Sequence, residues 1–156
     1  MIYLTVGTFP AGFDRLVKAV DDLCFKYRVQ CVAQISCGKY IPKHMSYNEF
    51  CSVEEQRKYI ENSEFVITHG GIGAIGDIMR QGKPMIVFPR LPEEAGHDQM
   101  PVSKRLSDTY GFSLCENIND LNDVFKEMLG SSNSFIDYPL GSNIPNLISD
   151  YLSNSC

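Results

Sequence analysis

The sequence lacks the apolar segments that a membrane-spanning or exported protein would carry. No apolar run approaches the roughly 20 residues that a helix needs to cross a bilayer. The stretch from Met1 to Val6 has neither the basic region nor the cleavage site of a signal peptide. Its apolar, β-rich character predicts a first strand instead. We therefore expect a cytoplasmic protein.

Basic charge and metal-ligand patterns are also scarce. The formal net charge is −5, which argues against nucleic acid as a partner, because a nucleic-acid binder usually presents a basic surface. The six cysteines form no C-x-x-C pair and show no ligand spacing with the three histidines. Without export signals, we expect free thiols. No D-x-D triplet suggests a divalent ion, so we predict no obligatory metal and no cofactor.

What the chain does have is the pattern of a folded domain in which strands and helices alternate. Its 156 residues are 44% apolar, enough for one domain with a core. Apolar runs predict strands at 2–6, 30–36, 45–50, 65–67, 85–88 and 112–115. Helical spacing of apolar residues predicts helices at 13–24, 52–61, 72–81, 98–110, 121–129 and 144–152. The alternation predicts an α/β fold, a Rossmann-like parallel sheet with helices on both faces.

Local signals mark several boundaries of these elements. Ser52 and Glu55 form a capping box that opens the second helix, Gly82 is suited to follow the third, and Asp98 can N-cap the fourth. We interpret residues 1–156 as a single domain with its core at 1–129. A helix at 142–153 follows a polar break, and its apolar face either packs on the core or docks on a partner.

The most informative stretch runs from Phe65 to Asp77. An apolar strand ends at Thr68-His69, four glycines follow within seven residues, and a helical pattern then begins. In an open parallel sheet such a turn lies at the carboxyl end of a strand, where ligands bind. Glycines let backbone N–H groups approach a ligand closely, and a helix N-terminus favours an anion. We predict that a phosphate-bearing ligand binds at this turn.

Two interpretations of the glycine turn need no other part of the chain. The segment 71–76 satisfies G-x-G-x-x-G, the fingerprint of a dinucleotide site. A ribose-binding acid would then be expected at the end of the next strand, whereas Glu93 and Glu94 lie several residues past it. Alternatively, the glycines serve only a tight turn and close packing of helix on strand.

A third interpretation draws in loops that leave the same edge of the sheet. Gly7 and Thr8 follow the first strand and can offer an N–H and a hydroxyl to phosphate, and Arg90 could neutralise it. Asp98 and Gln99 can pair with sugar hydroxyls, which need donors and acceptors. Such a set describes a nucleoside diphosphate sugar. The candidate donor-binding residues are Gly7, Thr8, His69, Gly70, Gly71, Gly73, Ala74, Asp77, Arg90, Asp98 and Gln99.

Each of these polar residues also has a plain structural interpretation. Asp77 could accept from ribose hydroxyls or be an ordinary first-turn acid favoured by the helix dipole. Arg90 could simply pair with Glu93 or Glu94. Asp98 could act only as an N-cap, and His97 could be a ligand contact or a solvated loop residue.

His69 is the candidate catalytic residue, because imidazole suits a general base. Beside a glycine loop it could instead donate to a phosphate or hold the loop in place. The departing diphosphate of a sugar transfer could be stabilised by the glycine-loop N–H groups, the helix dipole and Arg90, without a metal.

Several of these motifs carry a family resemblance. Thr5-Val6-Gly7-Thr8 resembles the opening of the small donor-binding subunits of split glycosyltransferases, including the PssE-type proteins of bacterial polysaccharide synthesis. Four later stretches are similar, in the same order, to the H-x-G-x-G, G-K-P, P-R and (D/N)-H-Q motifs of the glycosyltransferase family 28 C-terminal domain. They are Ile67 to Gly73, Gly82-Lys83-Pro84, Phe88-Pro89-Arg90 and His97-Asp98-Gln99.

The resemblance implies the C-terminal half of a GT-B fold and a function for it. By this resemblance the chain is the UDP-sugar-binding subunit of a two-component inverting glycosyltransferase. A membrane-anchored PssD-like subunit would hold a lipid-linked glycan acceptor, recruit this chain to the inner face of the membrane and supply the base if His69 does not. The pathway implied is capsular or exopolysaccharide repeat-unit synthesis. The alternatives are a non-catalytic enhancer subunit and a small NAD-dependent oxidoreductase.

The sequence departs from the family pattern at two positions. Histidine and acid are exchanged in His97-Asp98-Gln99, and Asp77 stands where many relatives carry a glutamate.

Overall fold

Strands and helices alternate along the chain, as the apolar pattern predicts. The computed structural model describes residues 1–131 and 135–140. The strands are β1 (Ile2–Thr5), β2 (Cys31–Gln34), β3 (Ser46–Asn48), β4 (Val66–Thr68), β5 (Met85–Val87) and β6 (Ser113–Leu114). The helices are α1 (Asp14–Tyr27), α2 (Val53–Asn62), α3 (Ile72–Arg80), α4 (Pro92–Ala95), α5 (Met100–Tyr110), the 3₁₀ turn η1 (Ile118–Asp120) and α6 (Leu121–Gly130).

The described strands form one six-stranded sheet in which every pair is parallel. Its order is β3-β2-β1-β4-β5-β6, which confirms the predicted α/β fold. The order reverses between β1 and β4, where Thr5 pairs with Thr68. A sheet of this kind opens a crevice outside the carboxyl ends of the strands at the reversal point. The loops that follow β1 and β4 therefore leave the sheet side by side.

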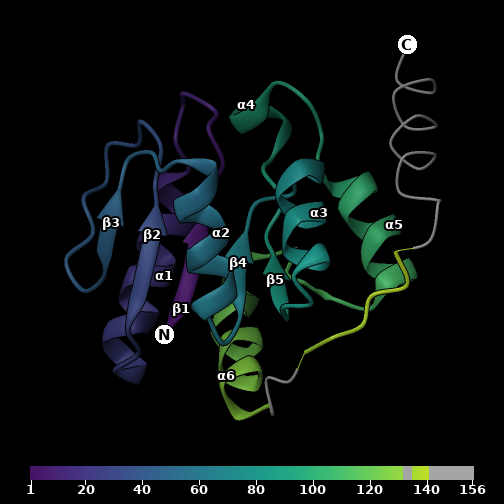
Figure 1. Cartoon of the computed structure of the whole chain (residues 1–156). Coiled ribbons are helices and arrows are strands. Elements are labelled where there is room, and N and C mark those ends of the chain that lie inside the picture. The colour runs from purple at the N-terminus through teal and green to yellow at the C-terminus, as the bar shows by residue number, and fades with distance from the viewer. Residues whose placement is uncertain (132–134, 141–156) are drawn as a thin grey trace.

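Helices cover both faces of the sheet (Figure 1), and the sheet separates the core into two clusters. Ile2 and Leu4 of β1 belong to one buried cluster, with residues of α1 and α6. Tyr3 points the other way and belongs to a second cluster, with residues of α2, α3 and α5. This alternation along one strand is the period-2 geometry of a pleated sheet, and it buries β1 on both sides.

The predicted boundaries hold at most elements and shift near the fourth helical segment. The capping box is present: Ser52 Oγ accepts from the N–H of Glu55 at 3.2 Å, and the Glu55 carboxylate accepts from the N–H of Ser52 at 2.7 Å. Asp98, predicted to N-cap α5, lies one residue too early. Gln99 is at the cap position, while Asp98 Oδ1 accepts from Met100 N at 3.0 Å in an Asx-type turn. The single turn α4 lies between β5 and α5.

The chain after α6 returns to the amino-terminal edge of the sheet. Ile136 donates its N–H to Gly82 O at 2.8 Å, and Tyr138, 4% exposed, donates its hydroxyl to Lys83 O at 3.0 Å. Lys83 Nζ in turn donates to Ser63 O at 2.9 Å, just before β4. Packing therefore continues beyond the core predicted at 1–129. The predicted helix at 142–153 lies outside the described residues.

Within residues 1–131 and 135–140, no helix combines the length and the apolar character needed to cross a bilayer.

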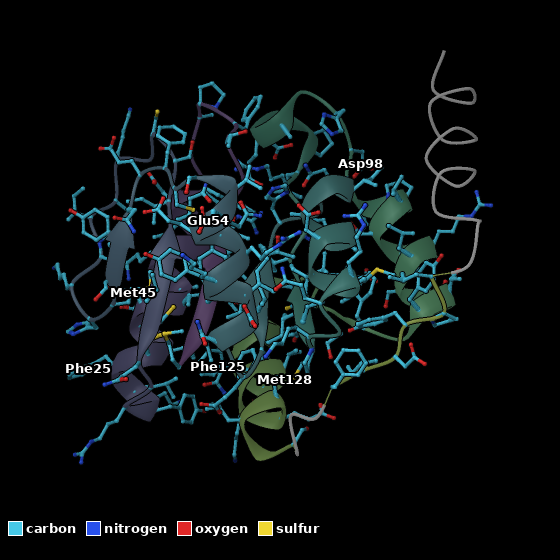
Figure 2. All side chains as sticks on the ribbon, in the orientation of Figure 1. Phe25, Met45, Glu54, Asp98, Phe125 and Met128 are labelled. Atoms are coloured by element: carbon cyan, nitrogen blue, oxygen red, sulfur yellow. The ribbon has the colours of Figure 1, made fainter. Side chains whose placement is uncertain are left out.

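The buried aromatic residue of α6 provides a test of the core. Phe125 is fully buried, with the rings of Tyr27 and Phe65 at 5.7 and 5.8 Å (Figure 2). We expect Phe125→Ala to lower the free energy of unfolding by about 3–5 kcal/mol, because it leaves a cavity. The matched control is Phe25→Ala in α1, since Phe25 is 66% exposed. Urea unfolding of both variants measures the difference, and equal losses would contradict this placement of the core.

Candidate functional site

A cleft opens at the carboxyl edge of the sheet, at the reversal point between β1 and β4. Loops that were predicted to converge there do so: the loop after β1, the turn from β4 into α3, and the segments after β5. A residue of α2 joins them. The cleft is lined by Thr5, Gly7, Thr8, Phe9, Pro10, Gln56, His69, Gly71, Gly73, Ala74, Arg90, Ala95, His97 and Gln99.

The imidazole of His69 lines this cleft, and one of its nitrogens already accepts a hydrogen bond. Its Nδ1 accepts a hydrogen bond from the N–H of Gly71 at 2.7 Å. A neutral ring whose Nδ1 accepts carries its hydrogen on Nε2. Burial, together with the charge of Arg90, lowers the pKa of His69 from its usual 6.5 to about 4. At neutral pH the ring is therefore an uncharged donor through Nε2.

Two glycines make room for this ring. Gly7 has a φ of +72°, which favours glycine, and a Cβ there would overlap His69 Nε2. Gly71 has an ordinary φ of −74°, but a Cβ there would overlap the other edge of the ring. The imidazole is thus held between the loops that follow β1 and β4. Gly70 serves a different contact, because its missing Cβ leaves room for Ser103 and Gln99 of the α5 segment.

The N-terminal turn of α3 faces the cleft without a capping side chain. Gly71 is the N-cap residue and has no side chain to offer. Gly73 is exposed, and a Cβ at this position would have no neighbouring described atom within 4 Å. Backbone N–H groups at a helix start carry partial positive charge and suit an anion. Gly73 and Ala74 line the cleft, and their contact with a ligand stays a prediction.

Arg90 is directed toward the protein interior. Its side chain is 2% exposed, and its guanidinium donates to Gly12 O and, at 2.8 Å, to Val6 O. The ring of Phe13 lies 4.6 Å from the guanidinium carbon. Its described hydrogen bonds hold the loop between Val6 and Gly12, and because Arg90 also lines the cleft, the phosphate contact stays a prediction.

The alternative partner predicted for Arg90 is also engaged elsewhere. Glu94 forms an ion pair with Arg15 of α1, at 2.8 Å between Nη2 and Oε2. The same carboxylate accepts from the N–H of Leu91 at 2.7 Å. Burial opposes the charge of Glu94, but these two contacts hold the pKa of its carboxyl below the usual value. Glu94 therefore fixes α4 to α1 beside the cleft.

Only part of the segment His97-Asp98-Gln99 faces the cleft. Gln99 is 7% exposed, and its Oε1 accepts from the N–H of Arg90 at 3.0 Å. His97 lines the cleft and its Nδ1 lies 3.0 Å from Ala95 O. Asp98, predicted to contact a sugar, is exposed and does not line the cleft. Its carboxylate is used in the turn before α5.

Asp77 lies in a second, smaller hollow beside the cleft. This hollow is lined by Val53, Gln56, Arg57, Ile60, Asp77, Arg80 and Gln81. Asp77 Oδ1 pairs with Arg80 Nη1 at 2.5 Å on the exposed side of α3. Gln56 of α2 lines both spaces and so connects them. Sequence reasoning missed Gln56, although its position in the first turn of a helix that follows a strand places it at this edge.

No group of three or more His, Cys, Asp or Glu side chains in the described part of the chain is arranged to hold a metal ion.

The packing of glycines on His69 leads to a double-mutant prediction. We expect Gly71→Ala to destabilise the protein by about 1–3 kcal/mol, because the methyl group overlaps the ring, whereas Gly73→Ala is neutral or stabilising. Combining Gly71→Ala with His69→Ala should recover the lost stability, because the methyl group then no longer overlaps the ring. When Gly7→Ala is combined with His69→Ala, the lost stability should be recovered only in part, because the backbone strain at φ +72° remains. Chemical denaturation measures all variants, and additive losses would contradict the contact.

The pKa of His69 predicts how stability depends on pH. Unfolded, the ring takes up a proton near pH 6.5, whereas the folded ring resists it until about pH 4. Stability that is present above pH 6.5 should therefore fall as the pH drops toward 4. NMR titration of the ring measures the folded pKa. Unfolding curves of His69→Ala should show a weaker decline over this interval, and an unchanged decline would contradict the assignment.

Comparison with known proteins places these observations in a family. The model of the glycosyltransferase family 28 C-terminal domain matches residues 1–137. No protein with a curated description matches the sequence. Among solved structures, MurG of Acinetobacter baumannii is similar, with 14% identity and a TM-score of 0.64, over 97% of this chain and 49% of that chain.

Two further structures have the same fold. The calicheamicin glycosyltransferase CalG4 has 13% identity and a TM-score of 0.64, over 97% of this chain and 39% of that one. The UDP-GlcNAc 2-epimerase of Methanocaldococcus jannaschii, solved with UDP-GlcNAc and UDP, has 13% identity and a TM-score of 0.60, over 98% and 45%. The chain thus spans less than half the length of each.

The predicted architecture is confirmed: the parallel sheet matches the C-terminal half of GT-B glycosyltransferases. Together with the family match over residues 1–137, this assigns the domain. The chain belongs to the glycosyltransferase family 28 C-terminal domain family.

Proposed function

We propose that this chain binds the UDP-sugar donor of an inverting glycosyltransferase and works with a second chain that holds the acceptor. The observation that carries the proposal is the cleft at the reversal point, which the start of α3 and the ring of His69 line together. A diphosphate needs several converging donors, and this cleft supplies them from backbone and imidazole. No metal is required for that role.

In this proposal His69 is a donor and the general base comes from elsewhere. Its Nδ1 is occupied by Gly71 N–H, and its pKa of about 4 makes the ring a weak base at neutral pH. Nε2–H is suited to a phosphate oxygen whose charge grows as the sugar departs. The base that activates the acceptor hydroxyl then belongs to the acceptor half.

The second hollow provides a place for the nucleoside. Asp77 can accept from ribose hydroxyls once its pair with Arg80 opens, and that pair is exposed, so opening it costs little. Gln56, between the two spaces, can donate and accept along the path from ribose to diphosphate. Gln99 also lines the cleft, and with its Oε1 fixed by the N–H of Arg90 its amide nitrogen is left to donate to a sugar hydroxyl.

Exposed apolar side chains at this edge of the sheet, which we call the apolar rim, are an argument for a second chain. Phe9, Phe50, Val53 and Leu91 follow strand ends at this edge, and they are 44%, 48%, 86% and 40% exposed. Exposed apolar side chains gathered beside a site are typical of an interface. We propose that a membrane-anchored PssD-like subunit covers this rim and recruits the chain to the membrane. It would also present a lipid-linked glycan acceptor of capsular or exopolysaccharide synthesis.

Calorimetric titration with UDP, UDP-sugars and NAD tests the donor site. We expect UDP and a UDP-sugar to bind and NAD not to bind. Gly73→Glu should weaken UDP binding at least about tenfold, because it places a carboxylate at the anion-binding start of α3. Gly73→Ala is the matched control and should bind as the parent does, since the position is open.

Two results would overturn the proposal. Binding of NAD without UDP would favour the oxidoreductase alternative. A folded chain that binds none of these ligands, yet raises the activity of a membrane-anchored transferase on co-expression, would favour the enhancer alternative. With such a partner and a lipid-linked acceptor, the parent chain should support sugar transfer and Gly73→Glu should not.

A further inference from the structure

A group of cations and exposed apolar side chains lies at the end of the molecule opposite the cleft. It comes from two segments, the C-terminal turn of α1 and the loop that leads into β3 (Figures 1 and 2). A shallow hollow between them is lined by Cys24, Phe25, Lys26, Arg28, Val29, Gln30 and His44. We call this group the basic–aromatic patch, and its exposed members are Phe25, Lys26, Arg28, Ile41, Lys43 and His44.

The apolar members of the patch face solvent although a core is available nearby. Phe25 is 66% exposed and Ile41 is 55% exposed. The ring of His44 lies 4.4 Å from that of Phe25, which brings the loop against the helix end. Phe25 is labelled at the outer edge of the molecule in Figure 2, directed away from the sheet.

A buried carboxylate fixes the two segments of the patch in one arrangement. Asp21 of α1 is fully buried and accepts from Lys43 N, His44 N and Tyr40 Oη, each at 2.8 Å. Burial opposes its charge, but these three donors lower the pKa of the Asp21 carboxyl below its usual value. The loop with Ile41 is therefore held against α1 one turn before Phe25.

The surface charge of the patch is positive although the whole chain carries −5. Lys26, Arg28 and Lys43 are exposed, and Lys26 donates to the neutral amide of Asn122 at 2.7 Å. Of the nearby acids, Asp123 accepts from the same Asn122, whose Nδ2 lies 3.0 Å from Asp123 Oδ1. Asp21 is buried under its three donors, and Asp22 pairs with Lys18 at 2.6 Å. Arg28 and Lys43 in particular are exposed and can attract an anionic surface.

We propose that the basic–aromatic patch docks on an anionic lipid membrane. Cations that surround exposed aromatic and aliphatic side chains are typical of interfacial membrane contacts, where the cations meet headgroups and the apolar groups enter the acyl boundary. The cations are spread over two segments and do not converge on one buried point, so a single free phosphate fits less well. A second copy meeting the same patch would bring like charges together.

This contact is independent of the donor site. The patch lies at the amino-terminal edge of the sheet and the cleft at the carboxyl edge, so a docked chain keeps its cleft open. The chain would then contact the membrane directly, in addition to being recruited by a partner subunit. The inference therefore holds or fails whether or not the cleft binds a UDP-sugar.

Vesicle sedimentation with the full chain tests the inference. We expect binding to vesicles of phosphatidylcholine mixed with phosphatidylglycerol, no binding to phosphatidylcholine alone, and a loss of binding as salt is raised. The double variant Lys26→Gln with Lys43→Gln should weaken partitioning at least about tenfold. Phe25→Ser should also weaken it, because the apolar contribution is lost.

Matched controls separate the patch from general effects. Lys58→Gln with Lys104→Gln removes the same charge on other surfaces, and Phe135→Ser removes an exposed aromatic from the segment that follows α6. Both controls should bind vesicles as the parent does. UDP binding should be unchanged in the patch variants if the cleft binds UDP, and circular dichroism checks that every variant is folded.

Four outcomes would overturn the inference. They are no binding to anionic vesicles at low salt, equal binding to both vesicle types, equal losses in the control variants, and release by inorganic phosphate at matched ionic strength. The last would identify a phosphate site. A dimer seen by light scattering and lost in the patch variants, without vesicle binding, would identify a second copy as the occupant.

Discussion

The architecture of the cleft depends on one buried guanidinium. Arg90 leaves β5 and reaches back to the carbonyl groups of Val6 and Gly12, while its own N–H is held by Gln99. Taking this charge out of water costs free energy, and burial lowers its pKa accordingly. The cost is offset by carbonyl acceptors and by the face of Phe13. Without this residue, the loop after β1 would lose its hydrogen bonds to the segment that follows β5.

The position of His69 follows from that connection. Gly7 lies in the loop that Arg90 holds, and the imidazole is packed against it on one side and against Gly71 on the other. The ring therefore links the two strands that flank the reversal point. Its burial, the neighbouring charge of Arg90 and the hydrogen bond to Gly71 all favour the neutral ring. Packing, and not a carboxylate partner, sets the protonation state at the centre of the cleft.

Local patterns made the fold and the glycine turn predictable from the sequence. The capping box at Ser52 and the apolar runs depend on neighbours in the chain, so they could be recognised without a structure. The direction of Arg90 could not, because its two carbonyl partners are 78 and 84 residues away in sequence. The position of Asp98 was predicted with a smaller error. Aspartate is a suitable N-cap residue, but α5 begins one residue later, and Gln99, which accepts from the N–H of Arg90, is at the cap position.

The segment that returns after α6 is linked to the cleft through β4. Tyr138 holds the carbonyl of Lys83, and the Lys83 amine holds Ser63 at the start of the segment that becomes β4. β4 has only three residues, which at about 3.3 Å each span about 10 Å. The contacts of the returning segment at one edge of the sheet therefore end only one short strand away from the imidazole at the other edge.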